Sequence, residues 1–245
     1  MELPDFTTAQ WCLAVLAGLC AGFSKAGMAG IGMLSVMIMA QGIPGKASSG
    51  AVLPLLIFAD IMAAVFFRQE ILWLHIRRLA LPIFTGIALG CAILYALPDQ
   101  AFKPVIGWMV LAMLALQILR QAKPSLTERL PHSSAFIWSA GLLTGASTMV
   151  ANAAGPIATI YLLLIGLQKK EFIATMAWLF LFVNLSKVPF SLGLGLISVS
   201  SFSLNLVLLP AVVAGLLIGR KCVERIPQKP FMILVLGFAA FSAVK

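Results

Sequence analysis

Ten apolar segments cover most of the chain, and their lengths repeat in the same order in its two halves. In each half two short segments come first and three longer ones follow. A helix that crosses the hydrocarbon core of a membrane needs about 20 residues, so the short segments cannot cross it alone. We therefore expect an all-α polytopic membrane protein in which each half begins with a broken helical hairpin. The segments are 11–23, 30–41, 50–67, 79–97, 102–119, 135–146, 155–167, 172–192, 203–219 and 230–244.

The composition excludes most other classes of protein. Hydrophobic residues make up 61% of the chain and charged residues 10%, whereas a typical soluble domain has about 25% charged residues. Most of the 17 Lys and Arg residues lie in short loops, as membrane anchoring requires, so the net charge of +9 does not indicate a nucleic-acid partner. The four cysteines and two histidines lack metal-binding spacing, so we expect no metal and no cofactor. The acidic start 1–5 is unlike a signal peptide, and we expect the first apolar segment to be retained.

The glycines of the two halves agree in their order, which indicates an internal duplication. The stretch "AGLCAGFS" (17–24) resembles "AGLLTGAS" (140–147), and further along Asp60 corresponds to Asn184. The other equivalent pairs include Gly18 and Gly141, Gly22 and Gly145, Ser24 and Ser147, Gly32 and Gly155, Gly86 and Gly215, and Gly90 and Gly219.

The loop charges favour repeats that enter the membrane in opposite directions. If each broken segment returns to the side it came from, twelve loop cations lie on one side and three on the other, whereas single crossings divide them almost evenly. The positive-inside rule therefore favours hairpins, with both termini outside and the linker 121–133 in the cytoplasm. We predict one transmembrane domain over 1–245 with two inverted repeats, 9–120 and 134–245, each a glycine-broken hairpin followed by three transmembrane helices. The twelve are Arg68, Arg77, Arg78, Arg120, Lys123, Arg129, Lys169, Lys170, Arg220, Lys221, Arg225 and Lys229, and the three are Lys46, Lys103 and Lys245.

The tips of the two hairpins predict a polar site in the middle of the membrane. Helix breaks at that depth persist only where they are buried in protein or line a cavity. The second arm of each hairpin begins near Gly30 or Gly155, and a helix N-terminus attracts anions through its free N–H groups. Because Lys25 adds a full positive charge, we predict an anion site. The predicted substrate-binding residues are Ser24, Lys25, Gly27, Gly30, Ser147, Thr148, Asn152, Gly155, Asn184 and Lys187.

Each polar residue of this predicted site also has a structural interpretation. Asp60, the one acidic residue inside an apolar segment, either neutralises a lysine or acts in proton coupling or gating. Lys25 either contacts the substrate or belongs to a packing ion pair, and Lys187, on a long helix, can extend to the membrane surface. The hydroxyl groups either contact the ligand or donate to their own helix backbone.

Taken together, these features resemble the TauE/SafE family of membrane permeases. The resemblance is carried by residues 21–71 and 141–190, each with a glycine-broken entry segment, a "G-x-x-x-K" turn and a helix with a polar centre. It implies transport of small sulfur-containing oxyanions such as sulfite or organosulfonates, usually outward across the bacterial inner membrane. The loop "FFRQEI" (66–71) resembles the family's basic stretch, but the second repeat reads "LGLGLI" (192–197) there. Symmetry therefore does not support a function for Arg68.

Three functions compete for this sequence. The leading hypothesis is a multi-pass exporter of small anions that works by alternating access around the midplane site. The alternative is an anion-selective channel with facing half-helices. An intramembrane serine hydrolase at "GAS" (145–147) is disfavoured because both histidines lie in loops, so we expect no enzyme. The expected partners are a small anionic substrate and the lipid bilayer, while the anion, the transport direction, the coupling ion and the formation of a homodimer stay open.

Overall fold

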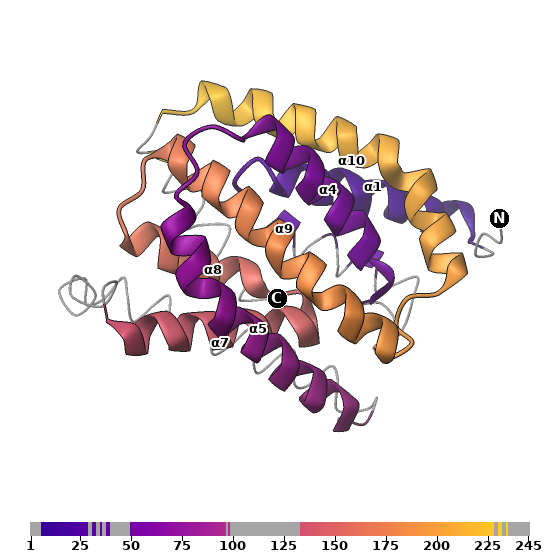
Figure 1. Ribbon diagram of the computed structural model, residues 1–245. Helices are drawn as coiled ribbons and strands as arrows, with labels where there is room; N and C mark the ends of the chain where they lie inside the picture. The colour runs from indigo at the N-terminus through magenta and orange to yellow at the C-terminus, as the bar shows by residue number, and fades with distance from the viewer. Residues whose placement is uncertain are drawn as a thin grey trace.

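In the described part of the computed structural model, every regular element is an α-helix (Figure 1). The structure describes residues 6–28, 31, 32, 35, 38, 39, 50–96, 98, 133–227, 230, 231 and 234. The predicted segment 102–119 lies outside these residues, as do most of 30–41, of 230–244 and of the linker. The helices are α1 Thr8–Ser24, α4 Leu53–Phe66, α5 Trp73–Ala96, α7 Ser134–Ala151, α8 Ala154–Leu164, α9 Lys169–Gly193 and α10 Val199–Arg225.

Among the described helices, α5, α9 and α10 are long and apolar enough to cross a membrane. Large apolar side chains such as Leu81 and Leu89 of α5 are exposed, as is expected of side chains that face lipid. The prediction of an all-helical membrane protein is confirmed. The total number of spans and the opposite orientation of the repeats stay predictions.

The first helix of each predicted hairpin is longer than the apolar segments indicated. α1 has 17 residues and α7 has 18, whereas we expected helices of little more than half the membrane thickness. Thr7 and Gln10 form a capping box that starts α1 before its first apolar residue, and the Ser133 side chain caps α7. Apolar runs understate these helices because polar capping residues and small residues extend them at both ends.

Both of these helices end at residues that change the direction of the chain. α1 ends at the cap residue Lys25, and Gly27 behind it has a φ of +105°, a conformation that glycine adopts readily. α7 ends at Asn152, which is left-handed with a φ of 52° and whose N–H donates back into the last turn of α7. Because α8 begins at Ala154, the predicted break in the second hairpin is present.

Glycines bring two pairs of helices into close contact, and each pair joins one predicted repeat to the other. In the first pair, a Cβ atom on Gly22 of α1 would lie 1.9 Å from the Val212 carbonyl oxygen of α10. In the second pair, a Cβ atom on Gly145 of α7 would lie 2.1 Å from the Ile83 carbonyl oxygen of α5. Helix backbones approach this closely only where small residues allow it. Since Gly22 and Gly145 are equivalent in the predicted duplication, the two contacts correspond to each other.

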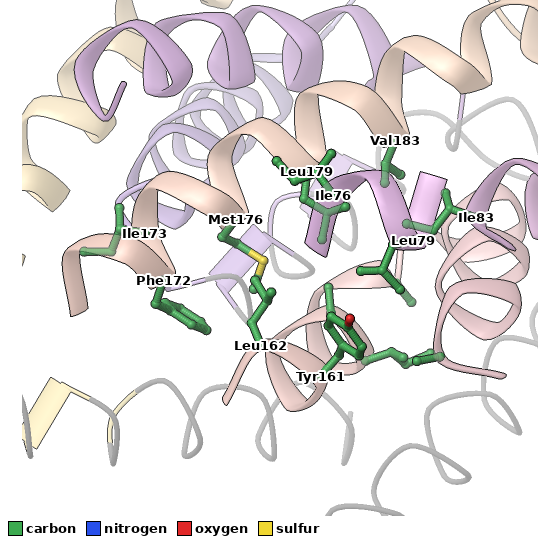
Figure 2. Packing of buried hydrophobic residues seen from close by; sticks show 14 of the residues in the cluster. Ile76, Leu79, Ile83, Tyr161, Leu162, Phe172, Ile173, Met176, Leu179 and Val183 are labelled. Carbon is green, nitrogen blue, oxygen red and sulfur yellow. The ribbon is translucent and has the colours of Figure 1, made fainter. Parts of the chain in front are cut away.

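The largest hydrophobic cluster among the described residues packs α5, α7, α8 and α9 together (Figure 2). α9 also contacts α4 and α7, and Figure 1 shows it running through the middle of the helices. This packing sets the centre of α9 beside the break between α7 and α8. The labelled members of the cluster are Ile76, Leu79, Ile83, Tyr161, Leu162, Phe172, Ile173, Met176, Leu179 and Val183.

Candidate functional site

A small cavity lies where the two helix breaks meet. Its volume is about 40 Å³, and it is bounded by the end of α1, the turn between α7 and α8, and the facing sides of α4 and α9. Six of the residues predicted to bind substrate line this central cavity, and four others complete the lining. The six are Ser24, Lys25, Thr148, Asn152, Gly155 and Asn184, and the four are Gly32, Leu56, Ala177 and Phe180.

A buried ion pair lies beside the central cavity. Lys25 Nζ is 2.7 Å from Asp60 Oδ1, and the two side chains are 9% and 0% exposed. Asn184 Nδ2 donates to the other oxygen, Asp60 Oδ2, at 2.6 Å. The Lys25 ammonium also lies 4.8 Å from the centre of the Phe180 ring, within the range of a cation–π contact. The ion pair that was one interpretation of Asp60 and Lys25 is therefore present, and it holds the ammonium at the cavity wall.

Lys187 is buried behind the cavity rather than in its wall. Its side chain lies one turn beyond Asn184 on α9 and donates to Asn152 Oδ1 at the break between α7 and α8. The interpretation in which Lys187 extends to the membrane surface is wrong, because only 1% of the residue is exposed. With both lysines protonated and Asp60 ionised, Lys25, Asp60 and Lys187 together carry one excess positive charge.

The hydroxyl groups of the predicted site differ in what they can offer a ligand. Ser24 Oγ donates to the Ala21 carbonyl oxygen at 2.7 Å, and Ser147 Oγ lies 3.2 Å from the Thr144 carbonyl oxygen. Both protons are thus directed at the helix backbone, as the structural interpretation of these serines required. Within the described part of the chain, the Thr148 hydroxyl makes no hydrogen bond, and Thr148 lines the cavity. It is therefore the hydroxyl best able to donate to a bound anion.

The three predicted glycines do not share one environment. Gly155 lies in the first turn of α8 and lines the cavity, so the free N–H groups at the start of that helix lie beside it. Gly27 is buried away from the cavity, where a Cβ atom would lie 2.9 Å from Ile173 Cγ1. Gly30 lies outside the described residues.

Sequence reasoning missed four residues of the cavity wall, three of which carry a signal. Gly32 is equivalent to Gly155 in the predicted duplication. Leu56 lies one helical turn before Asp60, and Phe180 one turn before Asn184, so helical spacing from the polar residues points to both. The fourth residue, Ala177, has no feature that separates it from the other alanines of α9.

The structure has apolar helices long enough to cross a membrane, and between two helix breaks it has a buried, charged cavity. These features define a helical membrane protein with an internal polar site. A family model described as sulfite exporter TauE/SafE matches residues 14–245, and the chain belongs to this family. The match confirms the resemblance seen in the sequence and gives a transmembrane transport protein of a sulfite or sulfonate exporter family, whose members are not enzymes. Comparisons with curated proteins and with solved structures give no match.

Proposed function

We propose that the protein exports a small sulfur-containing oxyanion by alternating access, and that the anion binds in the central cavity. The observation that carries this proposal is the shared cavity itself. The end of α1 supplies Lys25, while the break after α7 supplies Thr148 and the start of α8, so both predicted repeats contribute to one site. Each contribution is of a kind that binds anions: an ammonium, a hydroxyl and the N-terminus of a helix.

The charge and size of the site favour a small anion. When both lysines are protonated and Asp60 is ionised, the one excess positive charge of the three groups is neutralised by one negative charge on a ligand, which offsets the cost of burying it. A cavity needs about 10–15 Å³ to hold one water, so 40 Å³ accommodates roughly three waters or an anion of similar size such as sulfite. A larger organosulfonate requires the cavity to expand.

The two matched helix pairs support the proposed inverted repeats, 9–120 and 134–245. α1 of the first repeat packs against α10 of the second, and α7 of the second packs against α5 of the first. Equivalent glycines lie in both contacts, as a pseudo-twofold relation between the repeats requires. In transporters built from inverted repeats, movement of one repeat against the other opens the cavity to alternate sides of the membrane.

We place the protein in the bacterial inner membrane with both termini outside. Four of the loop cations assigned to the cytoplasm by the positive-inside rule, Arg68, Lys169, Lys170 and Arg220, lie around one cavity at one end of the helices, which supports this orientation. Export of an anion from the negative interior gains about 2.3 kcal/mol per charge per 100 mV, so no coupling ion is required. Asp60 acts in gating in this proposal, because loss of its charge releases Lys25.

The channel alternative fits the site less well. A conducting pore needs a continuous path with weak binding, whereas the central cavity is small and its lysine is held by a buried ion pair. Flux that saturates with anion concentration supports the transporter, and flux that rises linearly supports the channel. Transport that is unchanged by an imposed pH gradient argues against proton coupling through Asp60.

A pair of threonine variants tests the site. Thr148→Val removes the free hydroxyl of the cavity, and Thr159→Val removes a buried hydroxyl of α8 that has no hydrogen-bond partner among the described residues. In liposomes loaded with sulfite, we expect Thr148→Val to raise the KM of saturable flux about 5- to 30-fold, because one hydrogen bond to a charged ligand contributes about 1–2 kcal/mol. Thr159→Val is expected to transport like the wild type. Equal KM values for the two variants would place the anion elsewhere.

A further inference from the structure

A second and larger cavity lies where α4 ends, α9 begins and α10 ends. These three helix ends lie together at the upper left of Figure 1. The volume of this cavity is about 420 Å³, roughly tenfold that of the central cavity. We call it the outer cavity. Its charged lining consists of four cations and two carboxylates, so it carries an excess of positive charge. These residues are Arg68, Glu70, Lys169, Lys170, Arg220 and Glu224.

Both carboxylates of the outer cavity are already paired with cations of the same wall. Lys170 Nζ lies 3.7 Å from Glu70 Oε1, and Arg220 Nε lies 2.7 Å from Glu224 Oε1. Each acidic group thus has its own counter-charge within the lining. The excess positive charge therefore belongs to the two remaining cations.

The two remaining cations, Lys169 and Arg68, differ in the contacts that their side chains make. Lys169 donates to the carbonyls of Val223 and Ile226 at the end of α10, so its ammonium ties α9 to α10. Arg68 lies in the loop after α4 and is exposed, and no ion pair or hydrogen bond of its side chain exists in the described part of the chain. Its guanidinium is therefore available to bind an anion that enters the cavity, where the geometry of its N–H groups matches an oxyanion.

Apolar side chains connect the lining of the outer cavity with the lining of the central cavity. Ala63 of α4, Ala177 of α9 and Leu216 of α10 form a small buried cluster, and Phe67 packs against it. Ala177 lines the central cavity and Phe67 the outer one, so the cluster touches both. Ile173, in the outer wall, lies four residues before Ala177 on α9, which is about 6 Å along a helix.

We infer that the outer cavity is a vestibule in which the transported oxyanion binds before or after it occupies the central site. This inference rests on the proposed transport function. The cavity holds anions larger than the central cavity does, and its apolar wall of Phe66, Phe67 and Ile173 suits the carbon chain of an organosulfonate. In this inference, passage between the two sites requires the apolar cluster of Ala63, Ala177 and Leu216 to open. The structure thereby gives a role to Arg68, for which the symmetry of the sequence offered none.

Two arginine variants test the vestibule. Arg68→Gln removes the cation that makes no ion pair or hydrogen bond in the described part of the chain. Arg77→Gln is the control, because Arg77 is an exposed arginine of α5 that does not line the outer cavity. Sulfite flux is measured against sulfite concentration for the purified full chain in phosphatidylcholine liposomes. We expect Arg68→Gln to raise the KM about 3- to 10-fold with a maximal rate within about twofold of the wild type. The reason is that the excess positive charge of the outer cavity raises the local anion concentration. Arg77→Gln is expected to leave the KM unchanged.

The outcomes separate this inference from the proposed function. Absence of saturable sulfite flux in the wild type overturns the proposed function. Saturable wild-type flux with the same KM in Arg68→Gln and Arg77→Gln overturns the vestibule alone. A parallel series with phosphatidylglycerol tests a lipid headgroup as the occupant, and an effect of Arg68→Gln that exists only with this anionic lipid also overturns the vestibule. Thermal unfolding of both variants checks that the exposed substitutions leave the fold intact.

Discussion

The ion pair of Lys25 with Asp60 gives the sharpest test of how the central site is built. Lys25→Met removes the ammonium and leaves Asp60, which is 0% exposed, with the Asn184 side chain as its hydrogen-bond partner. Breaking a buried pair in this way costs about 3–5 kcal/mol, because the buried carboxylate loses the counter-charge that is bonded to it. For a chain of this size that corresponds to a fall in Tm of about 6–20 °C.

The double variant Lys25→Met/Asp60→Asn should recover most of this loss. It removes both members of the pair together, Lys187 stays buried as in the wild type, and an asparagine at position 60 can still accept a hydrogen bond from Asn184. We expect the Tm of the double variant to return to within about 6 °C of the wild type, since replacing both partners of a buried pair is often close to neutral. The measurement is thermal unfolding of the detergent-purified wild type, Lys25→Met, Asp60→Asn and the double variant, from which a double-mutant cycle yields the coupling free energy of the pair.

Transport by the same variants distinguishes the two interpretations of Lys25. If Lys25 contacts the anion, the stable double variant transports no sulfite, and its loss of flux is not a loss of folding. If the pair serves packing alone, flux returns together with the Tm. A Tm of Lys25→Met within about 2 °C of the wild type would refute the reasoning, because Asp60 would then not depend on Lys25 for its counter-charge.

Two further variants examine the packing and the charge of the site. Gly22→Ala should lower the stability by about 1–3 kcal/mol, because the added Cβ lies 1.9 Å from the Val212 carbonyl oxygen and forces α1 away from α10. Gly193→Ala, with open space around its Cβ, is the matched control, and equal Tm values for the two would contradict the close contact. Lys187→Met should raise the sulfite KM about tenfold or more in liposome flux, since it removes the excess positive charge near the cavity. An unchanged KM would show that this charge does not attract the anion.

The features of the fold that depend on local sequence could be predicted. Apolar length indicated the membrane helices, and the glycines together with Asn152 indicated where the hairpins break. The lengths of α1 and α7 were underestimated, because Thr7, Ser133 and the small residues near the breaks extend helices without adding apolar length. Hydrophobicity measures burial in lipid, whereas helix ends depend on capping.

The site was predictable in its charges but not in its contacts. A lysine at a helix break and an aspartate and an asparagine inside apolar segments are conspicuous, and all three lie at or beside the central cavity. The hydroxyl groups of Ser24 and Ser147 donate to the backbone, whereas that of Thr148 makes no such hydrogen bond within the described residues. This difference depends on side-chain rotamers, which the spacing of residues in the sequence does not reveal. The outer cavity was beyond prediction as well, because its wall combines a loop with the ends of three helices that only the tertiary structure brings together.

The contact between Asp60 and Asn184 links the duplication to the mechanism. These two residues are equivalent in the two predicted repeats, and in repeats related by a twofold axis, equivalent residues that bond to each other lie close to that axis. In the alignment of the two predicted repeats, Lys25 is equivalent to Thr148. In both of these equivalent pairs the charged residue belongs to the first repeat and the neutral residue to the second. In the proposed alternating access, each repeat adopts the conformation that the other repeat had before. The backbone of the opposite-facing state is then equivalent, but the charged residues stay in the first repeat. The inward-open and outward-open states therefore differ in energy, and a bound anion shifts their populations only by its difference in affinity for the two.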